Sequence, residues 1–188
     1  QAVIDNTISL SGDGSLNHIH SFGVLNSLVT DTYNFFRFPT RGHKTSFSLY
    51  CNTPLSDFTF LEISTSSSKI FPLSRGFLWY SSLRGRYVMP YGKDSKSYIP
   101  SSHYLNFEGS QDVRGYAYYS TGPTYNNNVV EGNIKISLRN ELVFPNKFLR
   151  LDTDTLRFSV FFDAGQVYRT YRTENIKQPR GMVFSTGL

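Results

Sequence analysis

The sequence predicts an all-β fold: an antiparallel sheet of long strands that crosses a membrane as part of a β-barrel. Three observations support this prediction: several segments alternate polar and apolar residues, these segments are long, and the composition is unusual. Hydrophobic residues make up 39% and charged residues 18% of the 188 residues, and both shares are low for a water-soluble domain. A membrane barrel has such a composition because apolar side chains face lipid while uncharged polar side chains face the lumen.

The clearest alternation runs through residues 133–142. One face carries polar side chains, at Asn133, Lys135, Ser137, Arg139 and Glu141. The other face carries apolar side chains, at Ile134, Ile136, Leu138 and Leu142. The pattern returns at 155–163, where Asp163 continues the polar row and Phe161 interrupts it. A period of two predicts strands whose two faces meet different surroundings.

Strand length favours a membrane barrel over a soluble sandwich, since an amphipathic sheet of either kind alternates in this way. Soluble strands usually have about 5–6 residues, and membrane strands need about 9–11. The alternating runs here extend over roughly 10–14 residues, which suits a membrane strand. We therefore place seven strands, at residues 18–33, 41–52, 56–69, 76–89, 131–144, 155–168 and 180–188.

The connections between these strands are expected to alternate between two sides. Proline-containing turns are predicted at 39–42, 52–54, 71–72 and 145–147. Barrels have short periplasmic turns and longer outer loops. The links at 34–40, 70–75 and 145–154 would be periplasmic, and those at 53–55, 90–130 and 169–179 would lie outside. The link at 90–130 is rich in Ser, Tyr, Gly and Asn and suits the rule, whereas the short link at 53–55 departs from it.

Several kinds of site find no support. The net charge is +5, but Lys and Arg are scattered and no nucleic-acid-binding fold is visible, so no nucleic acid partner is expected. The lone Cys51 excludes an internal disulfide framework. His18 and His20 would share one strand face, yet two histidines alone do not indicate a metal site. No nucleophile–base pair or phosphate loop is recognisable, so we expect no catalytic residue, no metal and no cofactor.

The ends of the chain suggest a piece of a longer protein. The chain opens with QAVIDNTISLSGDG, which has neither the basic start nor the apolar core of a signal peptide. No apolar run approaches the about 18 residues that a membrane helix needs.

The segment 106–116 contains Phe107-Glu108-Gly109-Ser110 followed by Val113-Arg114-Gly115-Tyr116. It resembles the sixth outer loop of the BamA family, the barrel subunits of the bacterial outer-membrane β-barrel assembly machinery, in the bacterial surface antigen and outer-membrane insertase superfamily. That loop carries an F-x-G-G run and a VRG[FY] tetrad. Ser110 stands where the family has its second glycine, so this block is matched with one departure.

Further blocks follow in the same order from about residue 28 to the end. The segment 33–42, which ends Phe38-Pro39-Thr40-Arg41-Gly42, resembles the family's periplasmic turn R-G-[FY]-F-P-T-x-G, although the glycine after Arg37 is not matched. Residues 138–142 resemble the strand that follows the loop. Residues 161–168 resemble the next strand, with its F-x-D-x-G-x-[VW] pattern.

The resemblance implies the organisation of the whole protein. The full barrel would have about sixteen strands, with periplasmic POTRA domains ahead of it. Residues 1–188 would form a partial barrel domain whose outer loop at about 90–130 folds inward. The POTRA domains would be absent from this chain, as would the first and last barrel strands, which form the family's lateral gate.

The resemblance also implies a function without catalysis: folding β-barrel proteins and inserting them into the bacterial outer membrane. The implied partners are outer-membrane lipid, unfolded β-barrel substrates, the lipoprotein subunits of the BAM complex and periplasmic chaperones. Two alternatives stay open. One is a related transporter of the superfamily that secretes a polypeptide through its lumen, and the other is a passive porin-like barrel.

In the family, the arginine of the tetrad pairs with acidic residues on the inner wall. Strand parity places Asp163 and Glu141 on the polar face, and therefore in the lumen, independently of the resemblance. We accordingly expect a loop-lock motif of Val113, Arg114, Gly115 and Tyr116. Gly115 would adopt a backbone conformation closed to other residues and so place Tyr116 against the wall.

The register leaves open whether Arg114 reaches both acids. A turn centred near residue 150 would put Glu141 opposite residue 159, and the acids would then lie about 13 Å apart. Asp163 would be the favoured partner, because its neighbour Gly165 leaves room for the loop. In the alternative interpretation, Arg114 is a solvated loop residue, and both acids balance wall cations at Lys135, Arg139 and Arg157.

Overall fold

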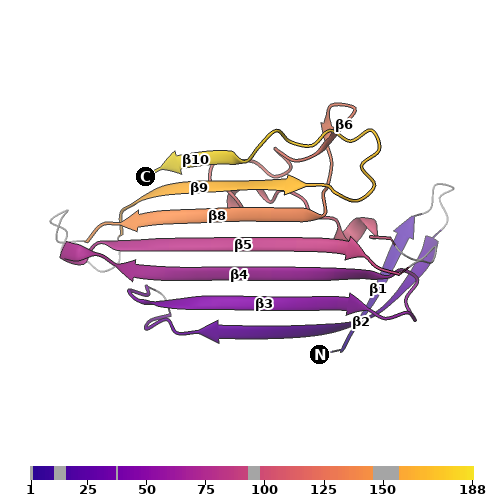
Figure 1. The fold of residues 1–188 in the computed structure, drawn as a ribbon, viewed down its shortest axis with the longest axis horizontal. Helices are drawn as coiled ribbons and strands as arrows, with labels where there is room; N and C mark the ends of the chain where they lie inside the picture. The colour runs from indigo at the N-terminus through magenta and orange to yellow at the C-terminus, as the bar shows by residue number, and fades with distance from the viewer. Residues whose placement is uncertain (1, 11–15, 37, 93–97, 146–156) are drawn as a thin grey trace.

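The computed structural model describes residues 2–10, 16–36, 38–92, 98–145 and 157–188, with side chains from His20 onward. Eight strands form one antiparallel sheet in chain order, apart from a small hairpin inserted between β5 and β8 (Figure 1). The strands of the sheet are β1 Ala2–Leu10, β2 Leu16–Asp31, β3 Gly42–Asn52, β4 Phe60–Pro72, β5 Leu78–Pro90, β8 Ile134–Val143, β9 Ser159–Tyr168 and β10 Val183–Gly187. No helix in the described part of the chain is long and apolar enough to cross a membrane.

The seven predicted strands are present, and the sheet has one more. The additional strand, β1, was not predicted, because Asn6 interrupts the apolar row of Ala2, Ile4 and Ile8 in the sequence. β1 pairs with residues 16–24 of β2. The strand predicted at 56–69 begins later, at Phe60, since the residues before it form a tight turn in which Ser56 N–H donates to the Thr53 carbonyl at 3.0 Å.

Smaller differences concern the turns. The predicted turn at 71–72 is wrong, because β4 continues through Pro72 and the chain reverses in the 3-10 turn η1, Ser74–Gly76. Some predictions fall partly or wholly outside the described residues. They are the contribution of Arg37 to the predicted periplasmic turn, positions 146–147 of the turn at 145–147, nearly all of the link at 145–154, residues 93–97 of the link at 90–130, and the first two residues of the strand at 155–168.

The two faces of the sheet have opposite polarity. On the outward face, large apolar side chains stay exposed, among them Leu28, Phe47, Trp79, Leu83 and Phe162. The other face is polar and is the face that the long loop covers. A soluble sandwich would bury the apolar face instead. A sheet that covers part of its polar face with a loop and leaves its apolar face bare is the wall of a membrane barrel.

The connection between β5 and β8 lies at one end of the sheet, over β8 to β10 (Figure 1). It contains the 3-10 turns η2, Ser101–His103, and η3, Gly109–Gln111. It also contains the hairpin of β6, Thr124–Tyr125, and β7, Asn128–Val129. The loop is thus ordered by its own turns and by its contacts with the wall.

A cluster that we call the aromatic anchor holds the first part of this loop. It consists of the buried residues Phe58, Phe60, Val88, Ile99 and Leu105. Tyr98 and Tyr104 pack against it from the loop, and Tyr171 from the connection after β9. Three connections at this end of the sheet therefore meet in one apolar cluster.

Candidate functional site: a loop lock

The backbone between Phe107 and Tyr119 forms a compact excursion that presents Arg114. Both Asp112 N–H and Val113 N–H donate to the Gly109 carbonyl at 2.9 Å, which closes the 3-10 turn η3. Tyr119 N–H donates to the Phe107 carbonyl at 2.9 Å and brings the chain back. Gly109 has φ +60, and a Cβ atom there would lie 2.8 Å from the Ala117 carbonyl carbon. Glycine is needed here, because a side chain would prevent the two halves from meeting.

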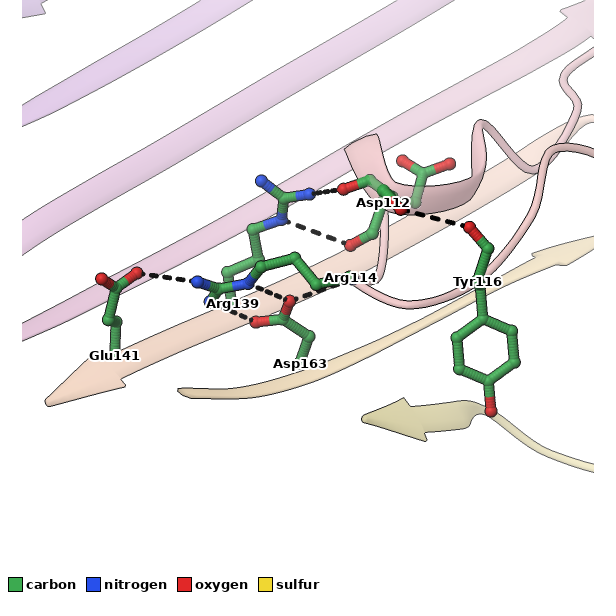
Figure 2. Close-up of polar contacts among 7 residues, drawn as sticks. Asp112, Arg114, Tyr116, Arg139, Glu141 and Asp163 are labelled. Atoms are coloured by element: carbon green, nitrogen blue, oxygen red, sulfur yellow. Dashed lines mark hydrogen bonds and ion pairs between the residues drawn. The ribbon is translucent and has the colours of Figure 1, made fainter. Parts of the chain in front are cut away.

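Arg114 bonds both acids that strand parity placed on the wall (Figure 2). Its Nε donates to Asp163 Oδ2 at 2.7 Å and its Nη2 donates to Asp163 Oδ1 at 2.8 Å, a bidentate pair. Its Nη1 donates to Glu141 Oε2 at 2.9 Å. Its backbone N–H also donates to Asp163 Oδ2, at 3.1 Å. A planar guanidinium that is held at three corners fixes the loop in direction as well as in distance.

The surroundings of the pair strengthen it. Asp163 is fully buried, whereas Arg114 keeps about a quarter of its side chain exposed. The hydrogen bond that Arg114 donates to Asp163 raises the pKa of Arg114, against the opposing effect of desolvation. The guanidinium carbon also lies 3.8 Å from the ring centre of Phe161, a cation–π contact. The arginine therefore stays charged and is held from two sides.

The register explains why both acids are reached, and it corrects the spacing predicted from the sequence. Glu141 lies opposite Phe161, and Arg139 lies opposite Asp163. The acids are therefore offset by two residues along the strands, about 7 Å, and not by the four residues predicted. The predicted offset was wrong, because the pairing of β8 with β9 is centred one residue later than assumed. At the shorter offset, one guanidinium can contact both carboxylates.

The other members of the tetrad each make a separate contact. A Cβ atom at Gly165 would lie 2.9 Å from Val113 Cγ2, so the absence of a side chain there admits Val113. Gly115 has φ +85, and a Cβ atom there would meet nothing within 4 Å, so its role is conformational and not one of space. Tyr116 Oη donates to the Phe184 carbonyl at 3.2 Å. The loop thus reaches β9 and β10 as well as β8.

An Omp85 superfamily domain matches residues 5–188. The chain belongs to the Omp85 superfamily. Proteins of this superfamily lie in the bacterial outer membrane, which agrees with the exposed apolar face of the sheet.

Two BamA proteins are similar to this chain, one in sequence and one in structure. The outer membrane protein assembly factor BamA of Neisseria meningitidis serogroup B is 30% identical over 152 residues, which cover 77% of this chain and 19% of the relative. The crystal structure of BamA from Haemophilus ducreyi lacking POTRA domains 1-3 superposes with a TM-score of 0.76 at 22% identity, covering 95% of this chain and 38% of that one. The chain therefore has the fold of part of a BamA-like barrel and spans less than two fifths of either relative.

Some residues that contact the loop were not predicted to belong to the site. Lys135 and Arg139 were considered only as wall cations that balance the acids, but both contact the loop. Arg139 donates to the carbonyl oxygens of Ser110 and, at 3.5 Å, of Asp112 (Figure 2). Phe161 could have been recognised from the sequence, since it interrupts the polar row that leads to Asp163.

Proposed function

We propose that this chain is part of the barrel of an outer-membrane protein assembly factor, which folds β-barrel proteins and inserts them into the outer membrane. The observation that carries the proposal is the arrangement of Arg114 between Asp163 and Glu141, which ties an outer loop to the inner wall of an Omp85 barrel. The name of the Neisseria relative describes the same activity. In this proposal, residues 1–188 belong to a larger barrel domain preceded by POTRA domains.

The proposed role of Val113, Arg114, Gly115 and Tyr116 is to lock the loop and stabilise the barrel. Insertion itself would take place at the barrel seam, driven by the folding free energy of the substrate, bilayer thinning and strand templating. The activity so proposed is not enzymatic and uses no cofactor. Its partners would be outer-membrane lipid, unfolded β-barrel substrates, BAM lipoprotein subunits and periplasmic chaperones.

Replacement of Arg114 by Glu in the full-length protein tests this proposal. The introduced carboxylate would then face the carboxylates of Asp163 and Glu141. The loop should therefore leave the wall, and barrel assembly should fail. Cells that depend on the variant should lose heat-modifiable, folded porins from their outer membranes. Lys44→Glu, which changes an exposed cation of β3 on the same face of the sheet, is the matched control and should leave porin levels near normal.

A second change separates the pair from a general defect. Adding Asp163→Arg to Arg114→Glu restores one opposite-charge contact and should partly recover folded porins. Normal porin levels in Arg114→Glu alone would refute the lock. Loss of one secreted polypeptide with intact porins would favour the secreting transporter, and open conductance without an assembly defect would favour a porin-like barrel.

A further inference from the structure

A second ion-pair site joins the same loop to the same strand. Lys135 lies on β8, six residues before Glu141 and on the same face. Its Nζ lies 2.7 Å from Glu108 Oε1 and 3.3 Å from Asp112 Oδ2. Lys135 keeps 7% of its surface exposed and Asp112 keeps 3%. A lysine buried to this extent needs opposite charge beside it, and the loop supplies two carboxylates.

Asp112 links this site to the shape of the loop. Its Oδ2 atom, which faces Lys135, also accepts the Glu108 N–H at 2.8 Å. The carboxylate therefore closes the turn that runs from Glu108 to Asp112, and Arg114 follows two residues later. The backbone of the same turn is held by Arg139, through the carbonyl oxygens of Ser110 and Asp112.

On the side of Lys135 that faces β3–β5, a cavity of about 350 Å³ separates the loop from the wall. Glu108, Asp112 and Lys135 line one side of this cavity. Its other sides are formed mainly by hydroxyl groups and arginines of β3, β4 and β5, including Ser46, Ser66 and Arg84. Side-chain packing against β3–β5 therefore does not fix this edge of the loop. It is held by the ion pairs with Lys135, together with Phe107 and Val113, which pack against Val167 of β9.

We propose that Lys135 is a positioning residue, which pairs with Asp112 and Glu108 to set the place of the loop along β8 and thereby aims Arg114 at its acids. Along β8, the wall then presents two cations followed by an anion, at Lys135, Arg139 and Glu141. The loop presents its groups in the same order: two carboxylates contact Lys135, two backbone carbonyls contact Arg139, and the Arg114 guanidinium contacts Glu141. A shift of the loop by one step would place Arg114 beside Arg139, so the order of charges admits one register. This inference deepens the loop lock proposed above and rests on it.

An engineered disulfide reports this register directly. The Cβ position of Gly165 lies 2.9 Å from a methyl group of Val113, so cysteines at these two positions are within reach of a disulfide bond when the loop is in place. The parent for the test is the full-length protein with Cys51→Ser, Val113→Cys and Gly165→Cys. The measurement is the rate of disulfide formation in isolated outer membranes under mild oxidation.

In this background, Lys135→Met should lower the rate about tenfold, as expected when a contact between charged groups is lost. Lys135→Arg should restore most of the rate, because it returns the charge. Lys44→Met is the matched control: it breaks an exposed ion pair with Asp31, 3.2 Å long, and should leave the rate unchanged. If Lys135→Met reduces the amount of folded barrel, Asp112→Asn replaces it, since the amide oxygen still accepts the Glu108 N–H and only the charge is lost.

An unchanged rate in both Lys135→Met and Asp112→Asn would overturn the positioning role, whatever the assembly assay shows. Normal assembly in Arg114→Glu would overturn the proposed function without affecting the disulfide result. The two failures are therefore distinguishable.

Discussion

Two regions hold the long loop to the sheet, and they do so by different interactions. The aromatic anchor buries Phe58, Phe60, Val88, Ile99 and Leu105, and His103 lies 4.4 Å from the ring centre of Phe60. The second region, which we call the ionic anchor, pairs Glu108, Asp112 and Arg114 of the loop with Lys135, Glu141 and Asp163 of the wall. The first excludes water from side chains, and the second joins charges in fixed directions.

The difference indicates a division of labour within one loop. Apolar burial is non-directional, so the aromatic anchor supplies free energy but tolerates small shifts. Bidentate pairs between charged groups depend on direction, so the ionic anchor selects one position. Stability and placement of the loop should therefore respond to different substitutions and to different salt concentrations.

The largest effect is expected for Phe60→Ala in the full-length protein. The ring is fully buried, and its loss should lower the free energy of unfolding by about 3–5 kcal/mol. Urea unfolding in detergent, followed by the gel mobility of unheated samples, measures this change. It should be the same in low and high NaCl, and a strong salt dependence would contradict the apolar origin. Phe36→Ala, at a fully exposed ring, is the control and should change the free energy by less than about 0.5 kcal/mol.

A smaller, salt-dependent effect is expected for Asp163→Asn. The bonds from Arg114 lose their charged acceptor, which should lower the free energy of unfolding by about 1.5–3 kcal/mol. The same urea titrations at rising NaCl should show the difference from the parent shrinking, because salt screens the partly exposed pair. Asp31→Asn, at the exposed pair with Lys44, should lower the free energy of unfolding much less, because exposed ion pairs contribute little. An equally large loss of stability in both variants would mean that the burial of Asp163 does not strengthen its pairing with Arg114.

The smallest effect is expected for Phe161→Leu, which keeps an apolar side chain but removes the ring beside Arg114. The cation–π contact should account for about 0.5–1 kcal/mol of the free energy of unfolding. In an Arg114→Met background, the same substitution should have little effect, and this double-mutant cycle isolates the contact. Equal losses in both backgrounds would assign Phe161 to packing alone.

The sequence predicted the ionic anchor better than the aromatic one. Side chains alternate along a strand, so parity was enough to place Glu141 and Asp163 on the polar face. Their mutual distance depends on how β8 and β9 are paired, which alternation does not determine. Whether one acid or both would meet Arg114 therefore could not be decided from the sequence.

The aromatic anchor had no comparable pattern. Its residues come from β4, β5 and the loop, at Phe60, Val88 and Leu105, and no local period links such distant positions. Phe58 was assigned to a strand, yet it lies in the turn before β4. Lys135 was recognised as a wall cation, but its pairing with Asp112 depends on how the loop folds back. Contacts between separate connections leave no periodic pattern within any one segment of the sequence.

The position of the lock along the chain has a consequence for how the barrel forms. Arg114 is separated from Glu141 by 27 residues and from Asp163 by 49. The entropy lost in closing loops of this length is smaller than that lost in joining more distant strands, by about 0.6 kcal/mol for each doubling of the separation. A unit of the loop, β8 and β9 is therefore expected to assemble early, before the slower long-range pairings of the barrel. The loop would then be enclosed as the barrel grows around it, with no need to thread into a finished lumen.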